Sequence, residues 1–383
     1  MKFDYIIVGA GLSGCVIAEQ LAKSENKKIL IIEKRNHIAG NCYDFRDENN
    51  ILIHKYGPHI FHTNNEKVWN YISQFTEWEN YQHQVLGSVD GMLIPIPFNI
   101  NSINKCFPKS MSKKIEAKLL EKYQYETKIP ILQLMKENDD LLKTFADFIY
   151  NKIFLGYTVK QWNLKPEELD KSVTARIPVF ISRDNRYFQD KYQGIPKFGY
   201  TKIIENMIDK PNIHLLLNTN FFDIKNELQY DKLIFTGMLD EYFNYEYGKL
   251  PYRSLRFEFE TIELSPKFNH YQQVAQVNYP NEYDFTRITE FIHFKQYFYN
   301  KSYNKNYNKS VIAKEYPIPY TNNNEIPYYP IPQKENNELA NKYKNLTKSL
   351  KNIIFLGRLA DYSYYNMDQT IERALIVAEK TIQ

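Results

Sequence analysis

A glycine-rich turn between two apolar runs near the N-terminus constrains the fold of this chain most. Gly9, Gly11 and Gly14 are spaced as GxGxxG after the apolar run 5–8, and a helical pattern leads to a second apolar run that ends at Glu33. The glycines allow a sharp turn and a close backbone approach to a pyrophosphate, which the N–H groups and the dipole at the helix start bind. The stretch therefore predicts a dinucleotide-binding βαβ unit, with Glu33 accepting hydrogen bonds from an adenosine ribose. A glycine-rich turn without a ligand is the alternative.

Composition narrows the class of protein. A chain of 383 residues suits two or three packed units. Its 49 Lys and Arg against 45 Asp and Glu leave a net charge of +4, too small for the field alone to indicate a nucleic-acid partner. No stretch approaches the length of a membrane span, and the N-terminus reads into a strand rather than a signal peptide, so no membrane insertion is expected. Three scattered cysteines without metal-ligand spacing fit reduced thiols and a cytoplasmic location.

A second cofactor contact is predicted just after the first motif. Residues 37–44 read HIAGNCYD, in which Gly40 and Asn41 fit a further backbone approach. Continuous phosphate and ribityl contacts of this kind favour FAD over NAD. Residues 56–63 read YGPHIFHT, where His59 and His62 have no third ligand nearby in the sequence, so no metal site is predicted. His59 fits either a place against a flavin ring or an ordinary hydrogen-bonded loop histidine.

The middle of the chain interrupts the nucleotide-binding unit. Apolar residues alternate around Asp90-Gly91, which predicts a β-hairpin over 84–98 whose prolines favour a sheet edge. Three-to-four spacing predicts helices over 113–124 and 140–154, and Gly156 is expected to mark a helix end. The aromatic residues that follow could stack on a pyrimidine base or could pack within the core of this helical insertion.

Further elements are expected on either side of this insertion. Thr63 with Glu66 is typical of a capping box for a helix that runs through residue 75. Strands are predicted over 212–217, 232–235, 250–264, 271–277, 286–294 and 353–356, and helices over 335–350 and from 368 or 369 onward. The last strand, the turn at Gly357 and the final helix start form a second corner suited to an anion.

Several of these stretches together closely resemble the bacterial-type UDP-galactopyranose mutases. The motifs that carry the resemblance are GAGLSG, HIAGN, YGPHIFHT, GYTVKQW, RIPV, DNRYF, QGIP, TRITE, PYYPI and GRL…Y…MD, in this order and across essentially the whole chain. The resemblance implies an isomerase, a homodimer, that reversibly converts UDP-galactopyranose to UDP-galactofuranose for cell-surface polysaccharide. It further implies FAD that is active when reduced, a flavin N5–sugar adduct and no net redox change. This cofactor chemistry fits a sequence that offers no Ser/His/Asp set and no clear paired carboxylates.

The resemblance also implies an α/β, multi-domain fold. We expect a Rossmann-like FAD-binding domain that is discontinuous in sequence, comprising residues 1–80, 196–246 and 335–383. A helical domain is expected over 99–170, with a mobile loop continuing to about 180. An antiparallel β-sheet domain is expected from 81–98, 181–195 and 247–334.

Site residues follow from the resemblance motif by motif. The residues implied to bind the UDP-sugar are Phe154, Tyr157, Thr158, Trp162, Arg176, Tyr187, Asn278, Arg287, Tyr329 and Tyr364. Tyr157 is implied to stack on uracil, while Arg176 and Arg287 hold the diphosphate. Those two arginines and His59, beside the flavin, are the implied catalytic residues. The residues implied to bind FAD are Gly9, Gly11, Leu12, Ser13, Gly14, Glu33, Lys34, Arg35, Gly40, Asn41, His59, Ile60, Gly237, Gly357, Arg358, Asn366, Met367 and Asp368.

Three positions depart from the family pattern. Ala39 replaces a glycine, Phe180 stands where many members carry a second arginine after RIPV, and Asn366 replaces a frequent aspartate. Other activities compatible with the sequence are a mutase acting also or mainly on UDP-N-acetylgalactosamine, a flavin amine-oxidase-like oxidoreductase, and a nucleotide-sugar-binding module that retains FAD.

Overall fold

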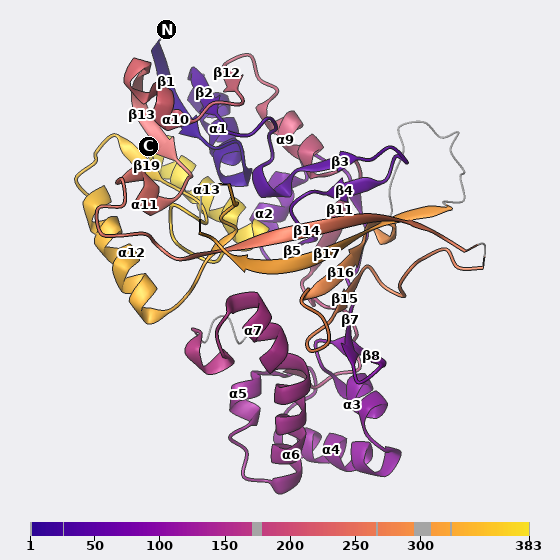
Figure 1. Ribbon diagram of the computed structural model, residues 1–383. Helices are drawn as coiled ribbons and strands as arrows, with labels where there is room; N and C mark the ends of the chain where they lie inside the picture. The colour runs from indigo at the N-terminus through magenta and orange to yellow at the C-terminus, as the bar shows by residue number, and fades with distance from the viewer. Residues whose placement is uncertain are drawn as a thin grey trace.

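The computed structural model describes residues 2–25, 27–170, 178–265, 267–294, 308–321 and 324–382. Arg176 and most of the predicted mobile loop lie outside these residues. Within them, five strands form a parallel sheet in the order β12-β2-β1-β13-β19 (Figure 1). They are β1 (Lys2–Val8), β2 (Ile29–Ile32), β12 (Ile213–Leu216), β13 (Gln229–Phe235) and β19 (Ile353–Phe355). This sheet confirms the predicted α/β fold class, and distant parts of the chain contribute its strands.

Apolar side chains cover both faces of this sheet, as is usual for parallel strands. On one face, α1 (Leu12–Glu25), α2 (Glu66–Ile72), α9 (Tyr200–Ile208) and α13 (Met367–Ile382) share a buried cluster with β1 and β2. On the other face, Phe3, Ile6 and Phe235 pack with Phe221 of α10 (Phe221–Ile224). Because α1 follows directly from the turn after β1, its N-terminus opens at the carboxyl edge of the sheet.

A buried carboxylate fixes where α9 begins. Asp44, in β3 (Asp44–Arg46) beside β4 (Leu52–His54), accepts hydrogen bonds from the backbone N–H groups of Tyr200 at 2.6 Å and Thr201 at 2.9 Å. The first N–H groups of a helix have no acceptor within the helix, so Asp44 caps α9 from a distant part of the chain. Burial raises the pKa of Asp44 above its ordinary value. The N-terminal segment and α9 are thereby held together.

Seven strands of the described chain form the second large sheet, in the order β18-β14-β17-β16-β15-β7-β8. They are β7 (Val85–Val89), β8 (Met92–Ile96), β14 (Tyr252–Glu263), β15 (Gln276–Asn278), β16 (Arg287–Glu290), β17 (Lys309–Pro319) and β18 (Tyr329–Pro330). Its neighbours pair antiparallel except β15 and β7, which pair in parallel, so the expected antiparallel sheet is mixed. The predicted hairpin is confirmed, since Asp90 and Gly91 have φ values of 49° and 79° and edge strand β8 carries Pro95.

A group of helices occupies the lower part of the molecule in Figure 1, away from the parallel sheet. They are α3 (Ile100–Cys106), α4 (Lys109–Lys122), α5 (Ile131–Leu134) and α6 (Asp140–Ile149), followed by the π-helical turn η2 (Tyr150–Leu155) and α7 (Gly156–Trp162). The expectation that Gly156 ends a helix is wrong, because the chain stays helical from α6 to α7 and leaves the helix at Asn163, with φ of 57°. A Cβ at Gly156 would lie 2.5 Å from the carbonyl oxygen of Pro280, so packing requires glycine there.

The predicted capping box at Thr63 and Glu66 is also wrong. The N-cap of α2 is Asn65, whose side chain accepts a hydrogen bond from the N–H of Val68, and the helix ends at Ile72. The Thr63 hydroxyl is used elsewhere, since it donates to Asp368 at 3.0 Å and accepts from the N–H of Asn65. Thr63 therefore joins this loop to the final helix.

The remaining elements complete the described chain. They are η1 (Gly40–Cys42), β5 (Phe61–Thr63), β6 (Trp78–Glu79), β9 (Lys128–Ile129), η3 (Pro166–Glu168), β10 (Val179–Phe180), β11 (Tyr192–Pro196), η4 (Lys225–Glu227), α11 (Leu239–Tyr242), η5 (Phe291–His293) and α12 (Lys334–Thr347). Among the described helices, none combines the length and the apolar character needed to cross a bilayer. The division into three domains stays a prediction.

Candidate active site

A cavity of about 480 Å³ opens at the carboxyl ends of β1, β2 and β13. The residues implied for the cofactor that line it are Gly9, Gly11, Leu12, Ser13, Glu33, Lys34, Arg35, Gly40, Asn41, His59, Gly237, Gly357, Arg358 and Met367. They come from the first βαβ unit, the histidine loop, the end of β13 and the C-terminal corner. The parallel sheet therefore gathers these segments around one space, which is where ligands bind in open α/β sheets.

Glycine geometry gives this cavity its backbone wall. A Cβ at Gly9, where φ is +107°, would lie 2.2 Å from the Thr236 hydroxyl oxygen. A Cβ at Gly40 would lie 2.9 Å from the Cα of Gly11, so the two glycine turns are in contact. Gly14 does not line the cavity, because its role is packing: a Cβ there would lie 2.0 Å from the carbonyl oxygen of Gly9. The wall is thus made of peptide groups that a bulky ligand can approach closely.

Glu33 stabilises the glycine-rich turn after β1 and the start of the loop after β2. Its Oε2 accepts from the N–H of Ala10 at 2.9 Å, and its Oε1 accepts from the N–H of Arg35 at 2.9 Å. A carboxylate oxygen has a further lone pair, so Glu33 retains capacity for ribose hydroxyls. Arg35 donates to the Asn41 side chain at 2.9 Å and lies over the ring of Tyr56, 4.6 Å from its centre. The peptide cradle, the helix start and this carboxylate fit a dinucleotide.

Three other residues implied for the cofactor contact other parts of the protein. Ile60 packs in a buried cluster with Ile195 and Phe291. Asp368 accepts from Thr63, as described above, and the carbonyl of Asn366 accepts from the backbone N–H and the hydroxyl of Thr370. None of these three lines the cavity. Their contacts shape the C-terminal corner, and direct cofactor contacts from them remain predictions.

His59 lies where this cavity meets the second half of the site. Burial lowers the pKa of His59 to about 4, and the positive charges of Arg358 and Arg287 act in the same direction. The ring is therefore neutral near pH 7. Its Nδ1 lies 2.8 Å from the carbonyl oxygen of Gly57, which only accepts, so Nδ1 carries the proton and Nε2 is left as an acceptor.

A second, smaller pocket lies between the helical layer and the mixed sheet. It is lined by four of the implied substrate residues, Phe154, Tyr157, Thr158 and Asn278, together with Gly87, Ile96, Ile153 and Pro280. Burial raises the pKa of Tyr157 above its ordinary value, so its hydroxyl stays protonated. The same residue feels the charges of Arg287 and Glu315 and the hydroxyls of Tyr187 and Tyr364. Residues from η2, α7 and β15 thus line this pocket, and Arg287 of β16 acts electrostatically on Tyr157.

Three aromatic rings from separate segments contact one another beside this pocket. Trp162 lies 5.1 Å from Tyr329 and 5.6 Å from Tyr364, between ring centres, and the two tyrosines are 5.3 Å apart. Tyr364 also lies near Arg358, whose guanidinium carbon is 5.6 Å from the ring centre. The cluster connects α7, β18 and the C-terminal corner, so it brings implied substrate and cofactor residues together.

Arg287 is held by a residue that sequence reasoning missed. Its Nε and Nη2 lie 2.9 Å and 2.7 Å from Oε2 of Glu315 on the neighbouring strand. Glu315 is only 2% exposed, while the Arg287 side chain is 23% exposed. Burial opposes the charge of Arg287, but the carboxylate of Glu315, together with Tyr157 and Tyr187, holds the pKa of Arg287 above its ordinary value. The only available signal was the position of Glu315 in the strand over 309–319, which no local motif marks.

Arg253 is a second missed residue. It is buried in β14, and its guanidinium donates to the carbonyl oxygens of Gln161 at 2.9 Å and Lys160 at 3.2 Å. These carbonyls are in the last turn of α7, where a cation is favourable. Lys160 in turn donates to the carbonyl of Tyr279 at 2.8 Å. The mixed sheet thereby fixes the helix that presents Tyr157 and Trp162.

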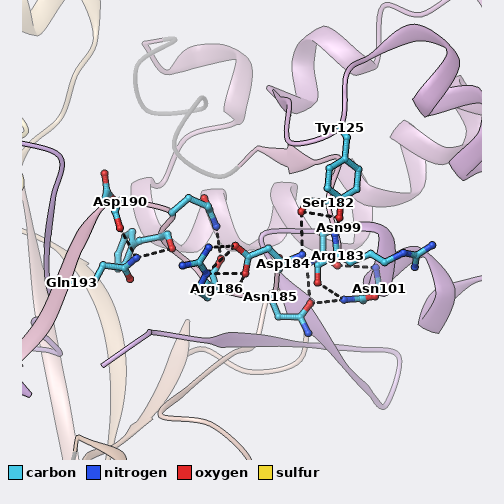
Figure 2. Close-up of polar contacts among 12 residues, drawn as sticks. Asn99, Asn101, Tyr125, Ser182, Arg183, Asp184, Asn185, Arg186, Asp190 and Gln193 are labelled. Carbon is cyan, nitrogen blue, oxygen red and sulfur yellow. Dashed lines mark hydrogen bonds and ion pairs between the residues drawn. The ribbon is translucent and has the colours of Figure 1, made fainter. Parts of the chain in front are cut away.

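A polar network holds the chain segments on either side of Tyr187 in the sequence, and Figure 2 shows its contacts at Asp184, Asn185 and Arg186. Asn99, the N-cap of α3, donates to the carbonyl of Asp184 and to the side chain of Asn185, both at 3.0 Å. Arg186 forms an ion pair with Asp184 at 2.7 Å. Further along, Asp190 accepts from His62 at 2.8 Å, and the His62 ring stacks on Phe188 at 3.6 Å between centres. Tyr187 lies between these two anchored ends.

The departure at Phe180 has a structural consequence. Phe180 is 2% exposed in β10, which pairs with β9, and its N–H donates to the carbonyl of Phe98 at 2.8 Å. A residue held in this way contributes to the core of the helical layer. Its side chain has no hydrogen-bond donor, unlike the arginine that many family members carry here.

A histidine-rich group elsewhere has a structural explanation. His270, Glu290 and His293 bring their ligand atoms within 4.8 Å of one another. The buried carboxylate of Glu290 already accepts from the N–H groups of Tyr271 at 2.8 Å and Gln272 at 2.9 Å. These bonds divert the backbone from a strand, so the predicted strand over 271–277 is wrong except for β15. The group stabilises a loop.

The fold and the cavity define a Rossmann-like dinucleotide-binding protein. Residues 7–75 match the model of the NAD(P)-binding Rossmann-like domain. The overall fold is similar to that of a crystal structure of reduced UDP-galactopyranose mutase, with a TM-score of 0.73, 17% identity, and coverage of 100% of this chain and 94% of that one. At that identity the similarity concerns the fold alone.

Sequence similarity identifies the family to which this chain belongs. Residues 152–364 match the UDP-galactopyranose mutase family model. The chain is 40% identical to a probable UDP-galactopyranose mutase of Klebsiella pneumoniae, over 98% of this chain and 94% of the relative. It is 35% identical to the dTDP-fucopyranose mutase of Escherichia coli, over 99% of this chain and 98% of the relative. The chain belongs to the UDP-galactopyranose mutase family, which confirms the resemblance.

Proposed function

We propose that this protein is an isomerase that interconverts UDP-galactopyranose and UDP-galactofuranose with FAD as its cofactor. The observation that carries the proposal is the meeting of two residue sets, one lining the glycine-walled cavity and one around Tyr157 and Arg287, on either side of His59. Family membership supports the reaction class. A cytoplasmic homodimer that supplies galactofuranose for polysaccharide is part of the same proposal.

The cofactor site suits FAD as follows. Gly9, Gly11 and Gly40 would allow the pyrophosphate to approach the backbone, and the N-terminus of α1 would bind its charge. Glu33 would accept the ribose hydroxyls. A bound and reduced flavin would supply a nucleophilic nitrogen for the anomeric carbon. His59, neutral and with Nε2 free to accept, would lie against the flavin without adding charge.

The side chains of the second half would bind and orient the nucleotide sugar. The ring of Tyr157 would stack on the base, which is worth about 1–3 kcal/mol. Arg287, with Arg176 from outside the described residues, would stabilise the charge that grows on the diphosphate as its bond to the sugar breaks. Tyr187, Tyr329 and Tyr364 would bind phosphate oxygens. Trp162, whose ring contacts those of Tyr329 and Tyr364, would line the sugar cleft.

A second substrate is supported by a specific relative. The chain is 35% identical to a dTDP-fucopyranose mutase, so a deoxythymidine nucleotide of a deoxyhexose is the competing substrate. The pocket around Tyr157 and Asn278 would have to accept the thymine methyl group in that case. UDP-N-acetylgalactosamine is the third substrate to test.

The deciding experiment is an isomerisation assay on dithionite-reduced protein. UDP-galactofuranose, dTDP-fucofuranose and UDP-N-acetylgalactofuranosamine are each incubated with it, and the pyranose product is followed by chromatography. We expect the highest kcat/KM with UDP-galactofuranose and no net consumption of dithionite per turnover. Conversion of none of them, or oxidation of an amine instead, would contradict the proposal, and a preference for the fucose nucleotide would replace the substrate.

A further inference from the structure

We infer that Glu315 is a positioning residue for Arg287, holding the inner edge of its guanidinium so that the outer edge faces the diphosphate of the nucleotide sugar. The inference rests on the proposed function, because it assumes that Arg287 meets a diphosphate. It assigns a role to a carboxylate that no motif in the sequence marks.

The geometry gives Glu315 a fixed hold on Arg287. A single oxygen, Oε2, accepts from both Nε at 2.9 Å and Nη2 at 2.7 Å. Arg287 and Glu315 are also direct cross-strand partners in β16 and β17, so the sheet register sets their distance. Glu315 is anchored further by its own carbonyl, which accepts from the N–H of Thr286 at 2.8 Å.

The space around Glu315 keeps its carboxylate in place. A Cβ at Gly57 would lie 3.6 Å from Oε2 of Glu315 and 3.1 Å from the ring of Phe257. Gly57 belongs to the loop that carries His59, so Glu315 is enclosed between this loop and Arg287. Because the Glu315 side chain is only 2% exposed, its carboxylate cannot turn toward solvent. Its position is therefore a property of the fold.

The remaining donors of Arg287 define the outer edge. A guanidinium has five N–H groups in a rigid fork, and Glu315 takes those of Nε and one of Nη2. Nη1 has a long contact, 3.5 Å, with the side chain of Gln276. The edge formed by Nη1 and the second Nη2 proton matches phosphate oxygens in pairs. Tyr157 and Tyr187, two residues implied to bind the nucleotide sugar, lie near Arg287, since both act electrostatically on it.

Glu315 also partly cancels the electrostatic field of Arg287. With Glu315 ionised, the two side chains together are neutral, so the diphosphate meets an oriented cation whose field is partly cancelled. Without the negative charge of Glu315, the guanidinium of Arg287 would no longer be held in one orientation. The repulsion between that carboxylate and the diphosphate would also be lost. Orientation should thus be lost while affinity for the diphosphate is kept or increased, which a general loss of structure would not produce.

The test compares Glu315→Gln with the wild-type holoenzyme. We expect kcat per bound flavin to fall about tenfold to a hundredfold, as for a misplaced catalytic group. The Kd for UDP is expected to stay within about threefold of wild type or to tighten, which corresponds to less than about 1 kcal/mol of lost binding. A kcat within about twofold of wild type, or UDP binding weakened in parallel with kcat, would overturn the inference.

A double-mutant cycle identifies the route of the effect. In an Arg287→Lys background, Glu315→Gln should change kcat by less than about twofold, because the fork that Glu315 orients is gone. An undiminished effect in that background would mean that Glu315 acts independently of Arg287. If Glu315→Gln does not fold, Glu315→Asp is used, which keeps the charge and shortens the reach, and the same cycle decides.

A matched control variant and the isomerisation assay of the wild type distinguish failure of this inference from failure of the proposed function. Glu290→Gln removes another fully buried carboxylate from the same sheet, and we expect its kcat per bound flavin to stay within about twofold of wild type. If the wild type isomerises no nucleotide sugar, the proposed function fails. If the wild type and Glu315→Gln turn over equally while Arg287→Lys is impaired, the inference alone fails.

Discussion

The two halves of the site are built from different parts of the polypeptide. The cavity over the parallel sheet has a wall of peptide groups at Gly9, Gly11 and Gly40, and its shape depends on backbone angles and the absence of Cβ atoms. The region around Tyr157 and Arg287 is built from side chains that the helical layer and the mixed sheet present. The first half selects for glycine, and the second selects for particular aromatic and charged groups.

This difference separates binding from specificity. A backbone wall binds any ligand that carries the right phosphate and ribose groups, so it is shared by many Rossmann-like proteins. A wall of side chains can change its ligand by substitution while the fold stays the same. Relatives in one family that act on UDP-galactopyranose and on dTDP-fucopyranose, as their names state, fit this division.

The largest expected effect is in the half made of side chains. Arg287→Ala should lower kcat about 10²- to 10³-fold with flavin still bound, because it removes a preformed cation from the charge that develops on the diphosphate. Steady-state kinetics with the flavin content measured on the same sample checks this. Arg256→Ala is the control, since Arg256 is an exposed arginine of the same sheet that pairs with Glu258. Near-normal turnover in Arg287→Ala would mean that the half of the site made of side chains does not stabilise the diphosphate as proposed.

Gly11→Val tests the half made of backbone. The side chain would enter the cavity beside Gly40, whose Cα lies 3.7 Å from a Cβ at Gly11. We expect flavin affinity to fall on the order of a hundredfold, from about 3 kcal/mol of overpacking. Flavin absorbance of the purified protein is the measurement, and Gly91→Asn, in an exposed hairpin turn with nothing within 4 Å, is the control. A fully yellow Gly11→Val protein would contradict the pyrophosphate placement.

Tyr157→Ala should have a smaller effect, on affinity more than on flavin content. Loss of base stacking costs about 1–3 kcal/mol, and we expect UDP to bind roughly tenfold more weakly. Titration of UDP followed by calorimetry measures this. Tyr157→Phe keeps the ring and should bind UDP almost as the wild type does. Equal UDP affinity in Tyr157→Ala would mean that the ring only packs the helical layer.

The same division explains how much the sequence could predict. The βαβ unit, the hairpin at Asp90-Gly91 and the return of the chain at β13 follow from local patterns of glycine and apolar residues, and the structure has them. Glu315 and Arg253 could not be found in this way. Each acts through strand register or a helix end far away in the chain, and a single sequence does not record such contacts.

Errors in the sequence-based description have the same cause. Gly156 suggested a helix end, yet its lack of a side chain is required by the carbonyl of Pro280 on another segment. Thr63 suggested a cap, but its hydroxyl donates to Asp368 at the far end of the chain. Local propensity was outweighed by tertiary contact in both cases. The resemblance to a family supplied the side-chain half of the site, and the roles of its residues stay predictions, including that of Arg176, which lies outside the described residues.

The smallest expected effect is that of Ala39→Gly, which tests the half of the site made of backbone. The family pattern has glycine at this position. Ala39 is buried in the cavity wall with φ of 70°, a left-handed conformation that costs an alanine about 1–2 kcal/mol. Ala39→Gly relieves this cost but loses a buried methyl group, about 0.8 kcal/mol, and gains freedom in the unfolded chain. We therefore expect the free energy of unfolding to change by less than about 1 kcal/mol, with flavin affinity unchanged. Chemical denaturation of the holoprotein tests this, and a larger change would mean that the methyl group, rather than the backbone angle, shapes this wall.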